Sequence, residues 1–95
     1  MPRIEPSSKK TYENQTGVQT FPVNEEFSMQ RVCVEGDTGV VVVKFRFPGM
    51  TQFMNVDSNE LAANTPGVWS LGAVAEIEVT PTNLANPYIL SVCAF

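Results

Sequence analysis

The stretch that decides the fold is VCVEGDTGVVVVKFRF, residues 32–47. Two runs rich in β-branched residues flank GDTG at 36–39, a cluster that supplies the positive φ angles and local hydrogen bonds of a tight turn. Beyond it, the side chains alternate between two faces: Val41, Val43, Phe45 and Phe47 on one, and Val40, Val42, Lys44 and Arg46 on the other. This period of two predicts strands on both sides of the turn, paired as a β-hairpin.

The rest of the chain repeats this pattern in shorter form. Short alternating or apolar runs separated by Gly, Pro and Asn predict further strands at 17–21, 27–35, 51–56, 68–71, 74–80 and 88–95. Residues 60–63 are expected to form a single helical turn, with Ser58 or Asn59 as its N-cap. Seven short antiparallel strands without a long helical period predict an all-β, single-domain β-sandwich.

The N-terminal segment differs from the rest of the chain. Residues 1–10, MPRIEPSSKK, are polar, contain two prolines and hold three of the six basic residues. We therefore predict an extended N-terminal arm at 1–16, followed by the sandwich domain at 17–95. The arm is either a frayed terminus or a partner-binding segment, in which Ile4 is the apolar anchor and Arg3, Lys9 and Lys10 meet an acidic surface.

Composition limits the classes of function. The 95 residues carry a net charge of −4 and no histidine, which argues against nucleic acid as a partner and removes the commonest general base and metal ligand. The N-terminus lacks the apolar core of a signal peptide, and no apolar run is long enough to span a membrane. Cys33 and Cys93 lie in apolar runs as small hydrophobes, and a disulfide between them requires neighbouring strands.

Few residues suggest a catalytic, metal-binding or ligand-binding role. Asp57 and Glu60 are too close together for a calcium loop, and a solvated turn explains them. Glu76 and Glu78 are expected to share the solvent-exposed face of the strand predicted at residues 74–80. Trp69, the single tryptophan, is either a core residue or a platform on which a sugar could stack. We expect no enzyme activity, no catalytic residue, no metal and no cofactor.

Residues 67–83, GVWSLGAVAEIEVTPTN, together with residues 32–47, resemble the small β-sandwich virion proteins of tailed bacteriophages. In those proteins two Val-rich strands around a Gly turn precede a Gly-x-Trp/Tyr-Ser-Leu motif and an Ile-x-Val-Thr-Pro strand. The resemblance covers residues 27–95. It departs at Glu76 and Glu78, where basic or neutral residues are frequent, and in the length of the arm.

The resemblance implies a structural virion protein, located in the virion and made in the bacterial cytoplasm. The expected role is a capsid decoration or cement protein that binds across coat-subunit joints. Its expected partners are the major capsid protein or other virion proteins, and a homo-oligomer of the protein itself is a further possibility. Residues 2–10 of the arm would lie along a neighbouring subunit, and their removal is expected to weaken binding to shells without unfolding the domain. The alternatives are a carbohydrate- or receptor-binding module and a tail or head–tail connector component.

Overall fold

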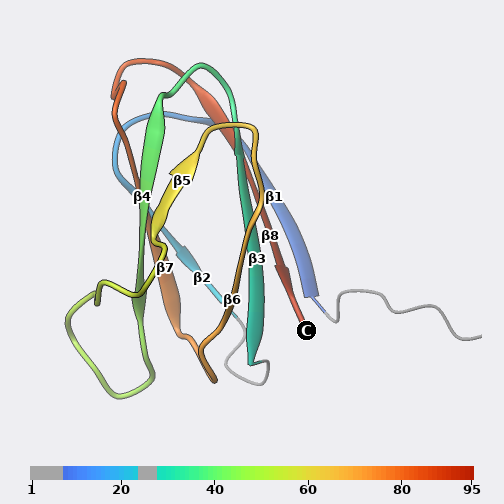
Figure 1. Cartoon of the computed structure of the whole chain (residues 1–95), viewed down its shortest axis with the longest axis vertical. Helices are drawn as coiled ribbons and strands as arrows, with labels where there is room; N and C mark the ends of the chain where they lie inside the picture. Colours follow the sequence, from blue (N-terminus) through green and yellow to red (C-terminus); the bar gives the residue numbers. More distant parts are fainter. Residues whose placement is uncertain (1–7, 24–27) are drawn as a thin grey trace, which may run out of the picture.

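The computed structural model describes residues 8–23 and 28–95. It confirms the all-β sandwich (Figure 1). The described residues form eight strands: β1 (Ser8–Gln15), β2 (Gln19–Pro22), β3 (Met29–Glu35), β4 (Val40–Arg46), β5 (Glu60–Ala62), β6 (Gly67–Ser70), β7 (Glu76–Pro81) and β8 (Tyr88–Ala94). No helix of the described residues has the length and apolar character that a membrane crossing requires.

The strands form two four-stranded antiparallel sheets. Sheet A has the order β1-β8-β3-β6 and sheet B the order β2-β7-β4-β5. Strands β1 and β2 therefore lie in different sheets, and so do β3 and β4, β5 and β6, and β7 and β8. All four of these connections lie at the same end of the sandwich, the upper end in Figure 1.

The core lies between the sheets and follows the period of two. Val32 and Val34 of β3 are fully buried, as are Val41, Val43 and Phe45 of β4. The other buried apolar side chains of this core come from the remaining strands and from residue 74: Phe21, Leu61, Trp69, Val74, Ile77, Val79, Tyr88, Leu90 and Val92. The inner face of β3 is thus the one that carries Val32 and Val34.

The predicted hairpin at residues 32–47 is wrong. β3 pairs with β6 and β8, whereas β4 pairs with β5 and β7, so residues 36–39 form an arch from one sheet to the other. Gly36 and Gly39 have positive φ angles, 145° and 71°, which serve an arch as well as a hairpin. The arch is favoured because it lets the apolar faces of β3 and β4 cover each other.

Two further expectations about elements are wrong. Residues 60–63 form strand β5 and not a helical turn, because pairing with β4 places Leu61 in the core opposite Val41. Residues 51–56 form no strand; only Met54 makes a bridge, with Phe45. β5 pairs with β4 at residues 40–42, and beyond β5 the contact of residues 51–56 with that edge is the bridge at Phe45.

The predicted arm also differs from the structure. Ser8–Gln15 form β1, which pairs along almost its whole length with β8, from Ser8 opposite Ala94 to Gln15 opposite Tyr88. The sequence of β1, SKKTYENQ, is polar and shows little alternation of apolar and polar residues. Its apolar contact to the core comes from Tyr12, whose ring packs on that of Phe21 with 4.6 Å between the centroids. Residues 1–7 lie outside the described residues.

Both cysteines are free. β3 and β8 are neighbours, but the register places Cys33 opposite Ser91 and Cys93 opposite Arg31. The two cysteines are thus diagonal neighbours, for which a separation of about 7–8 Å is typical. Such a separation exceeds the reach of a disulfide without backbone movement.

Candidate functional site

The four connections between the sheets, residues 16–18, 36–39, 63–66 and 82–87, form what we call the loop end. A dense set of hydrogen bonds from side chains to the backbone joins three of these loops to one another or to the strands. Short polar loops of this kind normally move, so their mutual attachment is the feature that distinguishes this end of the molecule.

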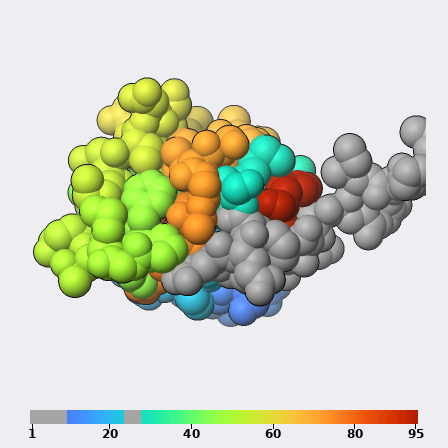
Figure 2. Space-filling model, turned by 90° about the horizontal axis from the view of Figure 1, so that it is seen from below, coloured from blue at the N-terminus to red at the C-terminus, as the bar shows by residue number. Residues whose placement is uncertain are grey.

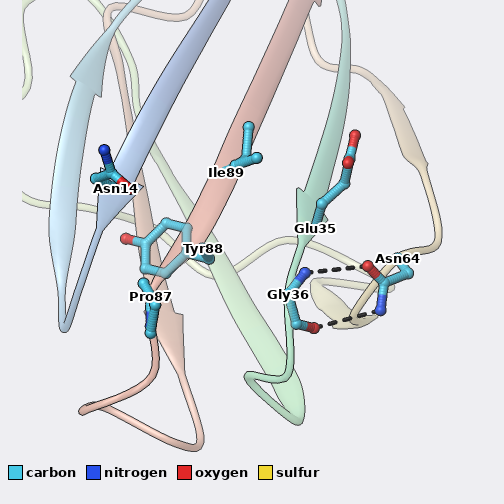
Figure 3. A pocket seen from close by; sticks show the side chains of 7 residues that line it. All are labelled: Asn14, Glu35, Gly36, Asn64, Pro87, Tyr88 and Ile89. Carbon is cyan, nitrogen blue, oxygen red and sulfur yellow. Dashed lines mark hydrogen bonds between the residues drawn. The ribbon is translucent and has the colours of Figure 1, made fainter.

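Asn64 attaches loop 63–66 to the end of β3. Its side-chain Oδ1 accepts a hydrogen bond from the Gly36 N–H at 3.0 Å, and its Nδ2 donates to the Gly36 carbonyl at 3.3 Å (Figure 3). The Asn64 N–H donates to the Val34 carbonyl at 2.7 Å. The side-chain amide thus takes the place of a peptide on a neighbouring strand, and the φ angle of 65° that it requires is one that Asn tolerates well.

Loop 82–87 holds the arch 36–39 in the same way. Asn86 Nδ2 donates to the Asp37 carbonyl at 2.6 Å, and the Asn83 N–H donates to the Thr38 carbonyl at 2.9 Å. Thr82 Oγ1 donates to the Val40 carbonyl at 2.7 Å. The polar side chains of residues 82–86 thus bond either to the arch, at Asp37, or to Val40, the first residue of β4.

Tyr88 connects β8 to the β1–β2 loop. Its hydroxyl donates to the Gly17 carbonyl at 3.1 Å, while its ring is buried, and this burial raises the pKa of the phenol. Next to it, β1 departs from regular pairing between Tyr12 and Gln15. Asn14 lies in this irregular segment with a φ of 56°, and a bulge of this kind redirects the edge of a sheet.

A pocket of about 420 Å³ opens beside these residues. It is lined by Asn14, Glu35, Gly36, Asn64, Pro87, Tyr88 and Ile89 (Figure 3). Three strands and three loops contribute: β1, the end of β3, the start of β8, and loops 36–39, 63–66 and 82–87. The lining combines one carboxylate and two amides with the apolar surfaces of Pro87 and Ile89.

Two apolar side chains project from the loop end. Val18 is 51% exposed and Leu84 is 53% exposed. The carbonyl of Leu84 lies 4.0 Å from the position that a Cβ on Gly17 would take, so their two loops are neighbours. At the opposite end, residues 47–59 form a projecting loop that carries the exposed Met50 and Met54 (Figure 2).

Two of the sequence-predicted site residues, Arg3 and Ile4, lie outside the described residues. The other two, Lys9 and Lys10, belong to β1, opposite Cys93 and Val92, and do not line the pocket. Sequence reasoning missed Asn14, Glu35 and Asn64. The only available signal for Asn64 was its place before Thr65-Pro66-Gly67, where a turn with positive φ is common.

Trp69 is buried, with 6% of its surface exposed, and its Nε1 donates to the Asp57 carbonyl at 3.2 Å. The core role is therefore confirmed, and Trp69 offers no platform for a sugar.

Glu76 forms an ion pair with Arg46 at 2.5 Å across sheet B. Within residues 8–23 and 28–95, no three Cys, Asp or Glu side chains come together as a metal site.

No family model matches the chain, and no curated protein matches it in sequence. Its fold is similar to that of PliG from Aeromonas hydrophila, a periplasmic inhibitor of g-type lysozyme, with a TM-score of 0.54 and 14% identity. The match covers 93% of this chain and 83% of PliG. At this identity the similarity shows a shared fold.

This comparison overturns the functional expectation from sequence. The fold matches a lysozyme inhibitor over nearly the whole chain, so the short Val-rich and Trp-containing motifs do not single out a capsid decoration protein. Such motifs describe strands and turns, which many sandwiches share. The alternatives tied to an exposed Trp69 or to a phage tail are withdrawn with it.

Proposed function

We propose that this protein is an inhibitor that binds a lysozyme through its loop end. The observation that carries the proposal is the fastening of loops 36–39, 63–66 and 82–87 by Asn64, Thr82 and Asn86. The shared fold with an inhibitor of g-type lysozyme supports the choice of partner.

A preorganised surface suits inhibition of an enzyme. Binding costs free energy when loops must be ordered, and this cost is small when the loops are already fixed by hydrogen bonds. Rigid inhibitors accordingly bind their enzymes with little movement of the backbone. Val18 and Leu84 supply apolar contacts that project from this fixed frame.

The mechanism is steric. The loop end would cover the substrate cleft of the enzyme, and the polymer substrate could not enter. Inhibition of this kind requires no catalytic group, metal or cofactor in the inhibitor. The protein is therefore a binding protein in this proposal and not an enzyme.

The test is an assay of cell-wall lysis with purified g-type lysozyme and, separately, c-type lysozyme, at increasing concentrations of the protein. We expect saturable inhibition with a stoichiometry of one to one. The double variant Val18→Asp, Leu84→Asp is expected to weaken inhibition at least tenfold, because two charges would be desolvated in the interface.

The matched control is Met50→Asp, Met54→Asp, which makes the same kind of change at the opposite end. It should inhibit as the unchanged protein does. Absence of inhibition of both lysozymes contradicts the proposed function. Equal weakening by the two double variants contradicts the assignment to the loop end.

A further inference from the structure

We propose that the pocket at the loop end binds a basic side chain, arginine or lysine, of the partner enzyme. The identity of the partner rests on the proposed function, whereas the preference for a cation rests on the pocket itself. Three features of the pocket carry this inference: a carboxylate without an ion-pair partner among the described residues, an apolar wall, and an unusual backbone conformation.

The carboxylate is that of Glu35, the one charged residue in the lining. It makes no ion pair or hydrogen bond with any described residue. Glu76, by contrast, is neutralised by Arg46 across sheet B. A carboxylate at the rim of a pocket and without a cation is complementary to a positively charged group.

Strand β3 also carries a cation, Arg31, whose guanidinium contacts groups outside the pocket. The Arg31 guanidinium lies 5.8 Å from the centroid of the Phe95 ring, and its Nη2 lies 3.5 Å from the Cys93 Sγ. Phe95 follows the end of β8, whereas Glu35 is opposite Ile89 near its beginning. Arg31 therefore does not fill the pocket, although both residues belong to β3.

The apolar wall suits the stem of a long basic side chain. Ile89 and Pro87 stand on the β8 side of the pocket, with Glu35 across from them on β3 (Figure 3). Arginine and lysine lay their methylene groups along apolar surface while the charged group stays at a polar rim. The volume of about 420 Å³ is in the range of pockets for small ligands.

The backbone that lines the pocket has an unusual conformation and passes close to β8. Gly36 has a φ of 145°, and a Cβ there would lie 2.8 Å from the Pro87 carbonyl oxygen. The described non-glycine residues with positive φ are Asn14, Ser58 and Asn64, and two of these three line the pocket. Unusual backbone conformations gather at binding sites because the site requires a shape that regular strands do not give.

The first experiment uses the protein alone. Backbone amide NMR signals are followed while Nα-acetyl-arginine methylamide is added, with the uncharged citrulline analogue as the comparison ligand. We expect saturable shifts at Gly36, Asn64 and Ile89 with the arginine ligand only. Glu35→Gln should abolish them, and Glu60→Gln, which removes an exposed carboxylate on β5, should leave them unchanged.

Equal shifts with citrulline, or unchanged shifts in Glu35→Gln, would overturn the assignment of a cation pocket. The second experiment uses the enzyme. Glu35→Gln should weaken inhibition about threefold to tenfold and reduce its dependence on salt, because one charge-assisted contact is lost. Glu60→Gln should do neither.

The two proposals fail separately. If neither lysozyme is inhibited but the arginine ligand still binds, the proposed function is wrong and the pocket stands. If lysozyme is inhibited but Glu35→Gln changes neither ligand binding nor inhibition, the function stands and the pocket assignment is wrong.

Discussion

Two threonines of the loop end have opposite surroundings. Thr38 is fully buried in the arch, and its Oγ1 makes no hydrogen bond with any described residue. Thr82 is exposed, and its Oγ1 donates to the Val40 carbonyl at 2.7 Å. A buried hydroxyl without a partner costs stability, whereas a satisfied one adds to it.

Replacement of each threonine by valine should therefore have opposite effects. We expect Thr38→Val to raise the free energy of unfolding by about 1 kcal/mol, because it removes an unsatisfied polar atom at nearly constant volume. We expect Thr82→Val to lower it by about 1 kcal/mol. Urea unfolding measures both; a loss of stability in Thr38→Val would mean that its hydroxyl has a partner.

Cys33 gives a prediction on pH. Burial, followed by the nearby Glu35 charge, raises its thiol pKa above the ordinary value of 9.0, against a smaller opposing effect of Arg31. The neutral thiol is thus favoured in the folded state, so its contribution to stability is complete below pH 9.0 and is lost as the pH rises through the raised pKa.

A thiolate-selective reagent should accordingly react with Cys33 more slowly in the folded protein than in urea at pH 8. The rate in the folded protein should still rise with pH beyond 9. Cys33→Ser provides the background from Cys93. A folded-state rate at pH 8 equal to that in urea would contradict the assignment.

At the scale of elements, sequence predicts strands better than their partners. The alternation at Val41, Val43 and Phe45, and that at Ile77 and Val79, identifies β4, β7 and their inner faces. The GDTG cluster identifies a chain reversal but not whether it stays in one sheet. That choice depends on which surface covers the apolar faces, a property of the assembled sandwich.

The candidate site was less accessible to sequence reasoning for the same reason. Asn14, Glu35 and Asn64 are ordinary polar residues until β1, β3 and loop 63–66 meet around β8. Ser8–Gln15 looked like an arm because a strand at the edge of a sheet buries little, and a single contact from Tyr12 leaves no periodic signal.

Strand β6 depends on a glycine for its packing. A Cβ on Gly67 would lie 2.5 Å from Trp69 Cη2 and 3.1 Å from Leu61 Cδ1. Gly67→Ala should therefore destabilise the protein by about 1–3 kcal/mol through overpacking and alter the near-ultraviolet circular dichroism of Trp69. Ser70→Ala, at an exposed position of the same strand, is the control and should change little.

At the scale of the whole molecule, the two most distant strands of the sequence are neighbours in sheet A. A chain that begins at Ser8 keeps β1, whereas one that begins at Gly17 loses it and uncovers the edge of β8. The first is the reference, because it retains all eight described strands. The second should unfold at much lower urea or self-associate through the free edge.

Analytical ultracentrifugation and urea unfolding distinguish these outcomes. The sequence predicts that removal of residues 2–10, the part of the arm expected to contact a partner, leaves the domain folded. A stable monomer that begins at Gly17 would show that β1 is dispensable after all, and that β8 tolerates an unpaired edge.

The pairing of Ser8 with Ala94 places the start of β1 and the end of β8 side by side. The chain enters and leaves the sandwich at one corner, and the pocket with its loops lies at the far end. A tag, a label or a fused domain attached before Ser8 or after Ala94 would therefore join the sandwich at the end opposite the loop end. Copies of the protein immobilised through an attachment next to Ser8 or next to Ala94 would all expose the loop end to the solution.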